Sequence, residues 1–400
     1  MSVPTGFVDP PPGGHTLPPV FHSASPAQRR PRRRAGWLLG ALGILLVAGI
    51  LSALQVAANL GYDEARSDFD DTRTSTRSAM SVVQGAADMV AGTAEVADLL
   101  LQSDSGVLVD PAARDALTAA VGDAREADEA ARRLLGESIP GAGPKPSFFW
   151  ELFAASEGLA ERTDDLERVG RDLAAQSPEL DTANASLTDA GLAVLGSAAT
   201  AASSFEAAHL SAKNDAVIAL RDAATDVTLA SALDDQAVGA LVALQDAAGQ
   251  VVASEQAELA EKAGPLQSVR LEIEAFARSL APGVLIEFDW SPVVNNAGFN
   301  GSMGGLTTWW WDEPDRAVIE LSNSVAEQWP ADRSKALVAH EVGHAISVKC
   351  EDMYDSTTQD SIEKWATAWA IGMGFSDDAN GVWAYGYPPQ SYIDAALACR

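Results

Sequence analysis

The first feature of the hydrophobic pattern is an uninterrupted apolar stretch near the N-terminus. Residues 35–60 carry no charged side chain, and about 20 apolar residues suffice for a helix to cross the hydrocarbon core of a bilayer. An arginine cluster at residues 29–34 precedes the stretch, and the acidic residues Asp63 and Glu64 follow it. The positive-inside rule predicts an uncleaved signal anchor, with the N-terminus in the cytoplasm and the chain beyond residue 60 extracellular. Cleavage as a signal peptide after residues 56–58 is the alternative.

Residues 1–34 show no apolar periodicity. They are rich in proline, arginine and small residues, and they hold too little apolar surface to offset the conformational entropy lost on folding. We therefore expect a disordered cytoplasmic tail, with a proline-binding partner as the alternative function of its prolines.

Residues 61–280 repeat apolar positions at the spacing of amphipathic helices. The region is rich in alanine, and its breaks fall at glycine and proline clusters such as residues 140–146. Asp110–Pro111 and Ser177–Pro178 each match a helix start, with a capping side chain before a proline in the first turn. We expect no seven-residue repeat sustained over four heptads, and therefore an extracytoplasmic bundle or stalk of antiparallel helices rather than a dimeric coiled coil.

Two groups of side chains in this helical region have more than one interpretation. The aromatic cluster at Phe148, Phe149 and Trp150 follows the main proline break, and we expect it to be buried between helices, with a membrane or partner contact as the alternative. His209 is the only histidine of the region, so we expect an exposed helical residue rather than a metal ligand. An envelope protein could bind the helical region, but nothing in residues 61–280 indicates an active site.

Beyond residue 280 the pattern changes to short strands and helices. Runs rich in β-branched and aromatic residues predict three strands, at 284–290, 306–311 and 317–321. Apolar residues at helical spacing predict three helices, at 334–346, 361–372 and 392–398. Between them we expect a glycine-rich loop, a turn and an aromatic loop, at 295–305, 312–316 and 383–387. Residues 281–400 are thus expected to form an α+β domain, joined through an all-α region to one transmembrane helix.

Composition separates the same regions and limits the class of partner. Eight of the ten tryptophans lie beyond residue 280, where they can fill a core. The net charge is −29, divided as about +4 over residues 1–34, about −22 over residues 61–280 and about −11 over residues 281–400. So acidic a chain repels the phosphates of a nucleic acid, which argues against nucleic acid as a partner.

The helix predicted at residues 334–346 contains the strongest chemical signal, the sequence His340-Glu341-x-x-His344. Residues four apart lie on the same helix face, so both imidazoles can bind one Zn²⁺ ion. Glu341 is next to the first ligand and can act as a general base on water at the metal. Gly343 leaves the helix surface bare, so another element can approach closely. An ordinary helix with two hydrogen-bonded histidines is the alternative.

A catalytic zinc ion usually takes a third protein ligand. No histidine follows His344, so this ligand must be a carboxylate or a thiol. Glu363 is favoured because Ala366 and Ala370 share its helix face, and a helix with so small a face could press against Gly343. A solvated glutamate in the first helical turn is the alternative. The rival ligands are carboxylates at or before the start of the same helix: Glu351, Asp352, Asp355 and Asp360.

These residues resemble the gluzincin clan of zinc metallopeptidases, in particular its minimal domains. The resemblance covers residues 284–400 and lies in a strand, a helix with the His-Glu-x-x-His motif and a second helix with Glu363. It implies hydrolysis of peptide bonds, with Glu341 as the general base and the substrate lying along an edge strand at 317–321. The zinc ligands that it implies are His340, His344 and Glu363.

We therefore expect a membrane-anchored, extracytoplasmic zinc metallopeptidase that acts on a peptide or protein substrate. Families of this kind often stabilise the oxyanion with a tyrosine or histidine, and Tyr354, Tyr385 and Tyr387 are candidates. The non-enzymatic alternative is an envelope scaffold or sensor with a degenerate or structural zinc domain. An intact Glu341 favours the enzyme, because a structural zinc site does not use a general base.

Cys350 and Cys399 are the only cysteines of the chain. In an oxidising compartment two cysteines favour a disulfide, which would fix the last helix beside the helix that carries the histidines. Cys350 as a fourth zinc ligand is the alternative. It lies six residues after His344 and therefore well off the histidine face of the helix.

Overall fold

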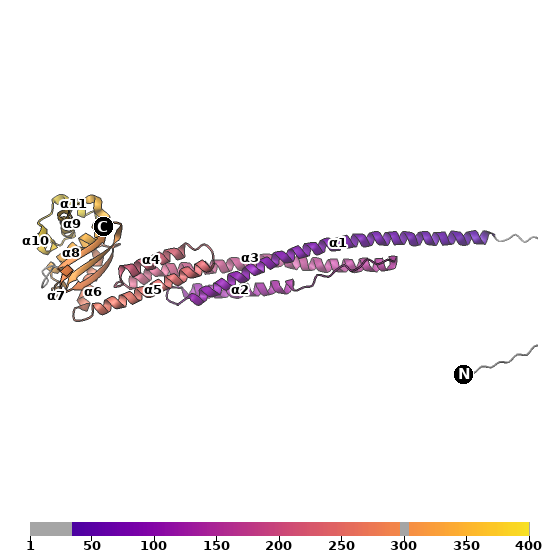
Figure 1. The fold of residues 1–400 in the computed structure, drawn as a ribbon, viewed down its shortest axis with the longest axis horizontal. Coiled ribbons are helices and arrows are strands. Elements are labelled where there is room, and N and C mark those ends of the chain that lie inside the picture. The colour runs from indigo at the N-terminus through magenta and orange to yellow at the C-terminus, as the bar shows by residue number, and fades with distance from the viewer. Residues whose placement is uncertain (1–33, 297–303, 400) are drawn as a thin grey trace, which may run out of the picture. The chain divides into compact units, whose positions relative to one another are not determined.

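The computed structural model describes residues 34–296 and 304–399 and contains two compact units. Of the described residues, one unit comprises 34–70 and 142–162, and the other comprises 71–141, 163–296 and 304–399. Two long helices, α1 (Arg34–Ser103) and α3 (Phe149–Ala208), contribute to both units (Figure 1). The tail expected at residues 1–34 and most of the loop expected at residues 295–305 lie outside the described residues.

In the first unit, α1 and the beginning of α3 run parallel. The side chain of Gln55 contacts the start of α3, and the ring of Phe69, further along α1, lies 5.9 Å from the guanidinium of Arg162. The buried apolar residues described in this unit are Ala58 and four larger side chains, Tyr62, Phe69, Leu152 and Leu159. This unit is therefore held by a narrow line of large apolar residues.

Among the described residues, two helices are long and apolar enough to cross a membrane. The first is α1, counted from Gly40, whose most apolar window is only 6% buried. The second is α5 (Asp235–Glu261), whose window is 33% buried and whose Leu241 and Leu244 lie in a helical core. Exposed apolar surface is what a lipid-facing helix requires, whereas a buried face is typical of a helix in a protein core.

A seven-residue repeat of buried positions follows both long helices. On α3 the buried positions are Leu152, Leu159, Leu166, Leu173, Leu180, Leu187 and Val194. On α1 they are Tyr62, Phe69, Thr76, Val83, Val90 and Ala97. The expectation that no heptad repeat is sustained was therefore wrong. The second inward position of most heptads on α3 is held by small or polar residues such as Gln176 and Ala183, with Val169 as an exception, and this hides the period in the sequence.

Pro178 lies inside α3 and does not begin a helix, so the helix start predicted at Ser177 was wrong. A proline in a helix interior costs about 3 kcal/mol. Leu173 and Leu180, on either side of it, are fully buried, and each buried leucine contributes about 1.5–3 kcal/mol. An uninterrupted helix keeps both leucines in the core, and their burial offsets the cost of the proline.

The second unit contains a core shared by five helices. They are the inner parts of α1 and α3 together with α2 (Pro111–Leu135), α4 (Asn214–Thr228) and α5. Asp110 caps α2 as predicted, since its carboxylate accepts a hydrogen bond from the N–H of Ala112. The shared core is aliphatic and includes Val90, Leu117, Leu187, Leu220, Leu241 and Val251. Helix α6 (Gln267–Leu280) instead contributes Ile273 and Ala277 to a second core, which also contains the sheet.

Three strands form the sheet of the second unit, in the order β1-β3-β2. Their bounds are Leu285–Ser291 for β1, Gly305–Trp310 for β2 and Glu313–Ser322 for β3. The central strand β3 pairs parallel with β1 and antiparallel with β2. The segment at 317–321 is therefore central, and the expectation that it forms a substrate-binding edge was wrong. The edge strand that packs against the histidine helix is β2.

All predicted strands and helices of this α+β region are present with shifted boundaries. The α-helices are α7 (Asn323–Glu327), α8 (Asp332–Ser347), α9 (Gln359–Gly372), α10 (Val382–Tyr385) and α11 (Gln390–Ala396). The 3₁₀ turns are η1 (Val294–Asn296), η2 (Val348–Met353) and η3 (Asp378–Asn380). The turn expected at 312–316 is shorter, because Glu313 already pairs with Trp310 in the hairpin. The aromatic loop expected at 383–387 contains the short helix α10 instead.

Three further expectations concern individual side chains. The predicted disulfide between Cys350 and Cys399 is present, and it links η2 to the segment after α11. The expected burial of Phe148 and Trp150 was wrong, because both are exposed ahead of Leu152, the first core position of α3. The expected exposure of His209 was also wrong. It follows the end of α3, and its Nδ1 lies 2.6 Å from a carboxylate oxygen of Glu255.

Helices α8 and α9 pack at close range where Gly343 faces Ala366. A Cβ atom added at Gly343 would lie 2.8 Å from the carbonyl oxygen and 2.9 Å from the Cα of Ala366. Real Cβ atoms do not approach backbone atoms so closely, so only glycine permits this separation of the helices. The close approach expected from the sequence at Gly343 is confirmed.

We predict that Gly343→Ala destabilises the protein by about 1–3 kcal/mol through overpacking, even though alanine is the better helix former. The measurement is the shift in the thermal unfolding midpoint followed by circular dichroism. Gly249→Ala on α5 is the matched control, because nothing lies within 4 Å of its added Cβ, and it should unfold at the same or a higher temperature. Equal stability of Gly343→Ala and the wild type would contradict the close packing.

Candidate metal centre

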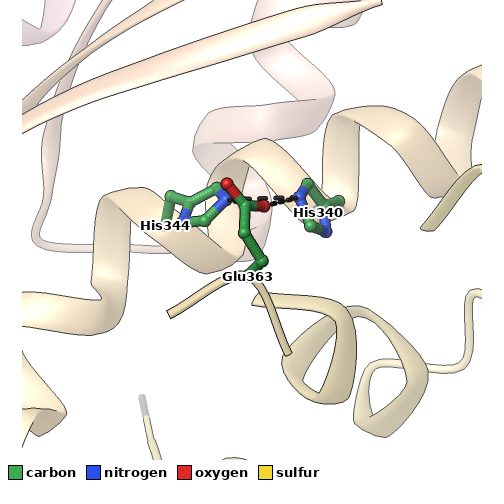
Figure 2. A group of neighbouring side chains, drawn as sticks. All are labelled: His340, His344 and Glu363. Carbon is green, nitrogen blue, oxygen red and sulfur yellow. Dashed lines mark hydrogen bonds and ion pairs between the residues drawn. The ribbon is translucent and has the colours of Figure 1, made fainter. Parts of the chain in front are cut away.

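Two histidines and a glutamate converge in the second unit, although they come from two helices. Helix α8 carries His340 and His344, and helix α9 carries Glu363. The two imidazole Nε2 atoms lie 3.2 Å apart, and Oε2 of Glu363 lies 3.2 Å from the first and 3.1 Å from the second. Figure 2 shows the carboxylate positioned between the two rings. In the described part of the chain this is the one group of three such side chains that could hold a metal ion.

The local sequence explains why these three side chains meet. Four-residue spacing places His340 and His344 on one face of α8. Gly343 lies between them and allows the backbone of α9 to approach at Ala366, one turn after Glu363. The three side chains are almost fully buried, which is costly for polar groups unless each finds a partner.

The orientation of His340 is fixed by its other ring nitrogen. Nδ1 lies 2.9 Å from the backbone oxygen of Asn380, which can only accept, so Nδ1 carries a proton and Nε2 is the ring nitrogen that faces the cluster. The next residue, Gly381, has a φ of 104°, and a Cβ atom there would lie 2.7 Å from Nδ1 of His340. Sequence reasoning missed both residues. The Asn-Gly pair signals a turn, but nothing in the sequence indicates that this turn contacts the histidine.

The ring of His344 is held by stacking instead. It lies parallel to the indole of Trp309 on β2, with the ring centres 5.2 Å apart and an angle of 5° between the planes. Its Nδ1 is buried without a hydrogen-bond partner within the described residues. The Trp309 stack therefore sets the plane of the ring and directs Nε2 towards Glu363.

The electrostatic environment of the cluster favours positive charge. Burial raises the pKa of Glu363, but hydrogen bonds with His340 and His344 outweigh this effect and hold the pKa well below its usual range. Burial lowers the pKa of His340, but the hydrogen bond with Glu363 and the charges of Glu341 and Glu363 raise it above its ordinary value overall. A site that stabilises a proton on an imidazole also attracts a metal cation, which competes for the same lone pair.

Glu341 and the cluster line the same cavity, which has a volume of about 520 Å³. The hydroxyl of Thr307 on β2 lies 2.8 Å from Oε2 of Glu341 and can donate to it. A Cβ atom added at Gly305 would lie 2.7 Å from Oε1, so the β2 backbone confines the other side of the carboxylate. The role of β2 in positioning Glu341 was not foreseen, because it depends on the sheet order rather than on a local motif.

The rival carboxylates do not join the cluster. Asp360 pairs with Lys364 at 2.8 Å, Asp355 accepts hydrogen bonds from Thr357, and Glu351 accepts one from Ser356. Asp352 is exposed to solvent. None of the four lines the cavity. The disulfide excludes Cys350 as a thiolate ligand, since its sulfur is bonded to Cys399.

Of the three candidate tyrosines, only Tyr385 lines the cavity. Its ring is nearly parallel to that of His340, with the centres 5.9 Å apart. Burial, and then the negative charge of Glu363, raise the pKa of Tyr385 to about 12, so the phenol stays protonated and can donate a hydrogen bond. Tyr354 instead stacks on Trp365, and Tyr387 is exposed.

The donor set fits a metal ion: two imidazole nitrogens and one carboxylate oxygen face a common point beside an open cavity. No family model, curated protein or solved structure matches this chain. Function must therefore be inferred from the chemistry of the site itself.

We predict that Glu363→Gln weakens the binding of a divalent cation by more than about 100-fold, because it removes a charged ligand rather than an outer partner. The measurement is competition with a chromogenic chelator, with circular dichroism as the check on folding. Asp360→Asn, on the same helix, is the matched control and should keep wild-type affinity. If the two variants bind the cation equally well, Glu363 is not a ligand.

Proposed function

We propose that this chain is a membrane-anchored, extracytoplasmic zinc metallopeptidase of gluzincin type, which hydrolyses peptide bonds. The observation that supports it most directly is the convergence of His340, His344 and Glu363 beside Glu341 at one cavity. Structural zinc sites are usually closed by four protein ligands, whereas catalytic sites have three and keep one position open. Three ligands and a general base beside an open cavity favour the catalytic kind.

The spacing of the donor atoms supports zinc as the metal. Ligands at about 2.0–2.1 Å from a tetrahedral ion lie about 3.3 Å from one another. The three donor atoms lie 3.1–3.2 Å apart, close to that value. Larger cations such as Ca²⁺ take six to eight oxygen ligands and do not suit two imidazoles.

In the proposed reaction, a zinc ion supplies Lewis acidity, which polarises the scissile carbonyl and lowers the pKa of water. His340 and His344 present Nε2 lone pairs, and Gln359 donates to Oε1 of Glu363 at 2.8 Å, which leaves Oε2 for the metal. Glu341 removes a proton from the attacking water and delivers it to the leaving amine. The neutral phenol of Tyr385 donates a hydrogen bond to the developing oxyanion.

The substrate is proposed to be an extended peptide that pairs with strand β2. This strand is at the edge of the sheet and lines the cavity with Gly305, Leu306, Thr307 and Trp309. An extended chain added to a free edge gains main-chain hydrogen bonds without requiring a particular sequence. The exposed Trp383 also lines the cavity and provides an apolar surface for side chains of the substrate.

The proposed location is the outer side of a cell membrane. The exposed apolar part of α1 would cross the bilayer once, and the arginines at residues 29–34 would remain in the cytoplasm. The disulfide between Cys350 and Cys399 agrees with an oxidising compartment outside that membrane. The helical region is then available to an envelope protein.

We predict that Glu341→Gln keeps zinc but lowers peptide hydrolysis by about 10²–10⁴-fold, because the amide cannot accept the proton of water. Cleavage of a quenched fluorescent peptide library and zinc content by mass spectrometry are the two measurements. Glu351→Gln, outside the cavity, is the control and should retain both activity and zinc. Hydrolysis at the wild-type rate by Glu341→Gln would exclude the general-base role. Zinc binding without hydrolysis in the wild type would favour the scaffold or sensor.

We predict that a protease added outside intact cells removes the chain beyond residue 60 and spares the cytoplasmic arginine cluster at residues 29–34. Epitope tags at the two ends, detected by immunoblotting, report the two portions separately. Cells opened with detergent serve as the control, in which both tags should be lost. Protection of residues 281–400 in intact cells would reverse the proposed orientation.

A further inference from the structure

The segment before α3 runs along α1 towards its N-terminal, apolar end. Three contacts within the first unit mark its course. The carbonyl of Gly143 accepts from Arg66 at 3.2 Å, Lys145 pairs with Asp63 at 2.6 Å, and the carbonyl of Ser147 accepts from Gln55 at 3.1 Å. Between Gly143 and Ser147 the segment advances by only four residues, while the residue that it contacts on α1 changes from Arg66 to Gln55. Four residues cover this distance only if the segment is extended.

At Gln55 the chain reverses direction. The N–H of Phe149 donates to Oε1 of Gln55 at 2.9 Å, while the amide nitrogen of the same side chain holds Ser147. Helix α3 then runs back beside α1 (Figure 1), and within this unit Arg162 of α3 lies over the ring of Phe69. Residues 147–153, here named the tip, are therefore the part of this segment nearest to the apolar end of α1.

The tip lies level with the last turns of the apolar stretch of α1. Gln55 precedes the end of that stretch, residue 60, by five residues, or about 7.5 Å along the helix. Val56 and Leu60, on the intervening turns, are both exposed. If α1 crosses a bilayer, this level is the boundary between acyl chains and headgroups.

The tip presents large aromatic side chains outward at this level. Phe148, Trp150 and Phe153 are 53%, 56% and 47% exposed, whereas Leu152 between them is fully buried. The rings of Phe148 and Trp150 stack with their centres 4.8 Å apart. Exposed aromatic groups of this size mark an interaction surface. Tryptophan is enriched at membrane interfaces, and phenylalanine is typical of the apolar face of helices that lie in the interface.

We propose that the tip inserts its aromatic side chains into the interface of the same bilayer that α1 crosses. The proposal rests on the proposed membrane anchor and adds a second contact with lipid to it. The nearest basic group, Lys145, is paired with Asp63, and Glu151 adds a negative charge. Attraction to anionic headgroups is therefore absent at the tip, and the insertion is driven by apolar burial and requires only zwitterionic lipid.

The test uses the full-length protein in phosphatidylcholine vesicles with one spin label at a time. The two native cysteines are paired, so an introduced cysteine is the sole free thiol. Leu46→Cys reports on the anchor and Ala154→Cys on the tip. Ala154 is exposed and one turn from Trp150, so it leaves all three aromatic rings in place. Glu161→Cys, about two turns further along α3, is the control for water.

Accessibility to oxygen, which concentrates in lipid, is compared with accessibility to a water-soluble nickel complex. We expect the ratio at position 154 to exceed that at position 161 several-fold, with the highest ratio at position 46. A triple variant, Phe148→Ser/Trp150→Ser/Phe153→Ser, should reduce the oxygen-to-nickel accessibility ratio at position 154 to the value at position 161. Adding anionic lipid or salt should not change the result.

Three outcomes would each refute one part of the proposal: the insertion of the tip, the anchor, or lipid as what covers the tip. A lipid-like ratio at position 46 with a water-like ratio at position 154 would leave the anchor intact and refute the tip. A water-like ratio at position 46 would refute the anchor itself. Shielding of position 154 from both reagents, with slow label motion, would show that protein rather than lipid covers the tip.

Discussion

The candidate site depends on the close contact between α8 and α9 at Gly343. This contact brings Glu363 from a separate helix to within 3.2 Å of both imidazoles, which no local feature of α8 could do. It also buries a carboxylate, and the free-energy cost of that burial is met by the two histidines. The motif on α8 supplies two of the three candidate donor atoms, from His340 and His344. Because Gly343 has no side chain, α9 comes close enough for Glu363 to supply the third.

The site could be predicted to the extent that it is local. His340, Glu341 and His344 follow from helical spacing alone. Glu363 could be ranked above Asp360 because the small residues Ala366 and Ala370 mark a face that packs closely, and the geometry agrees with that reasoning. Its role as a metal ligand, like that of Glu341 as a base, remains a prediction that depends on measurements with the metal.

The contacts that could not be predicted from the sequence join segments that are far apart in the chain. Thr307 reaches Glu341 only because β2 is the edge strand beside α8, and the order of the strands is not encoded in their own residues. The contact of Asn380 with His340 depends on a turn 40 residues away. The position of Pro178 inside a continuous helix was missed for another reason, since local propensity opposes it and only the packing of the leucines on either side favours it.

The seven-residue spacing of buried positions on α1 and α3 limits how such a protein can change in length. One inserted residue rotates every later side chain by about 100° around the helix, which would turn Phe69 or Leu159 away from the core. Seven residues inserted in both helices restore the same faces and add about 10 Å. Descendants of this sequence can therefore vary the reach of the paired helices only in discrete steps, by gaining or losing whole heptads together.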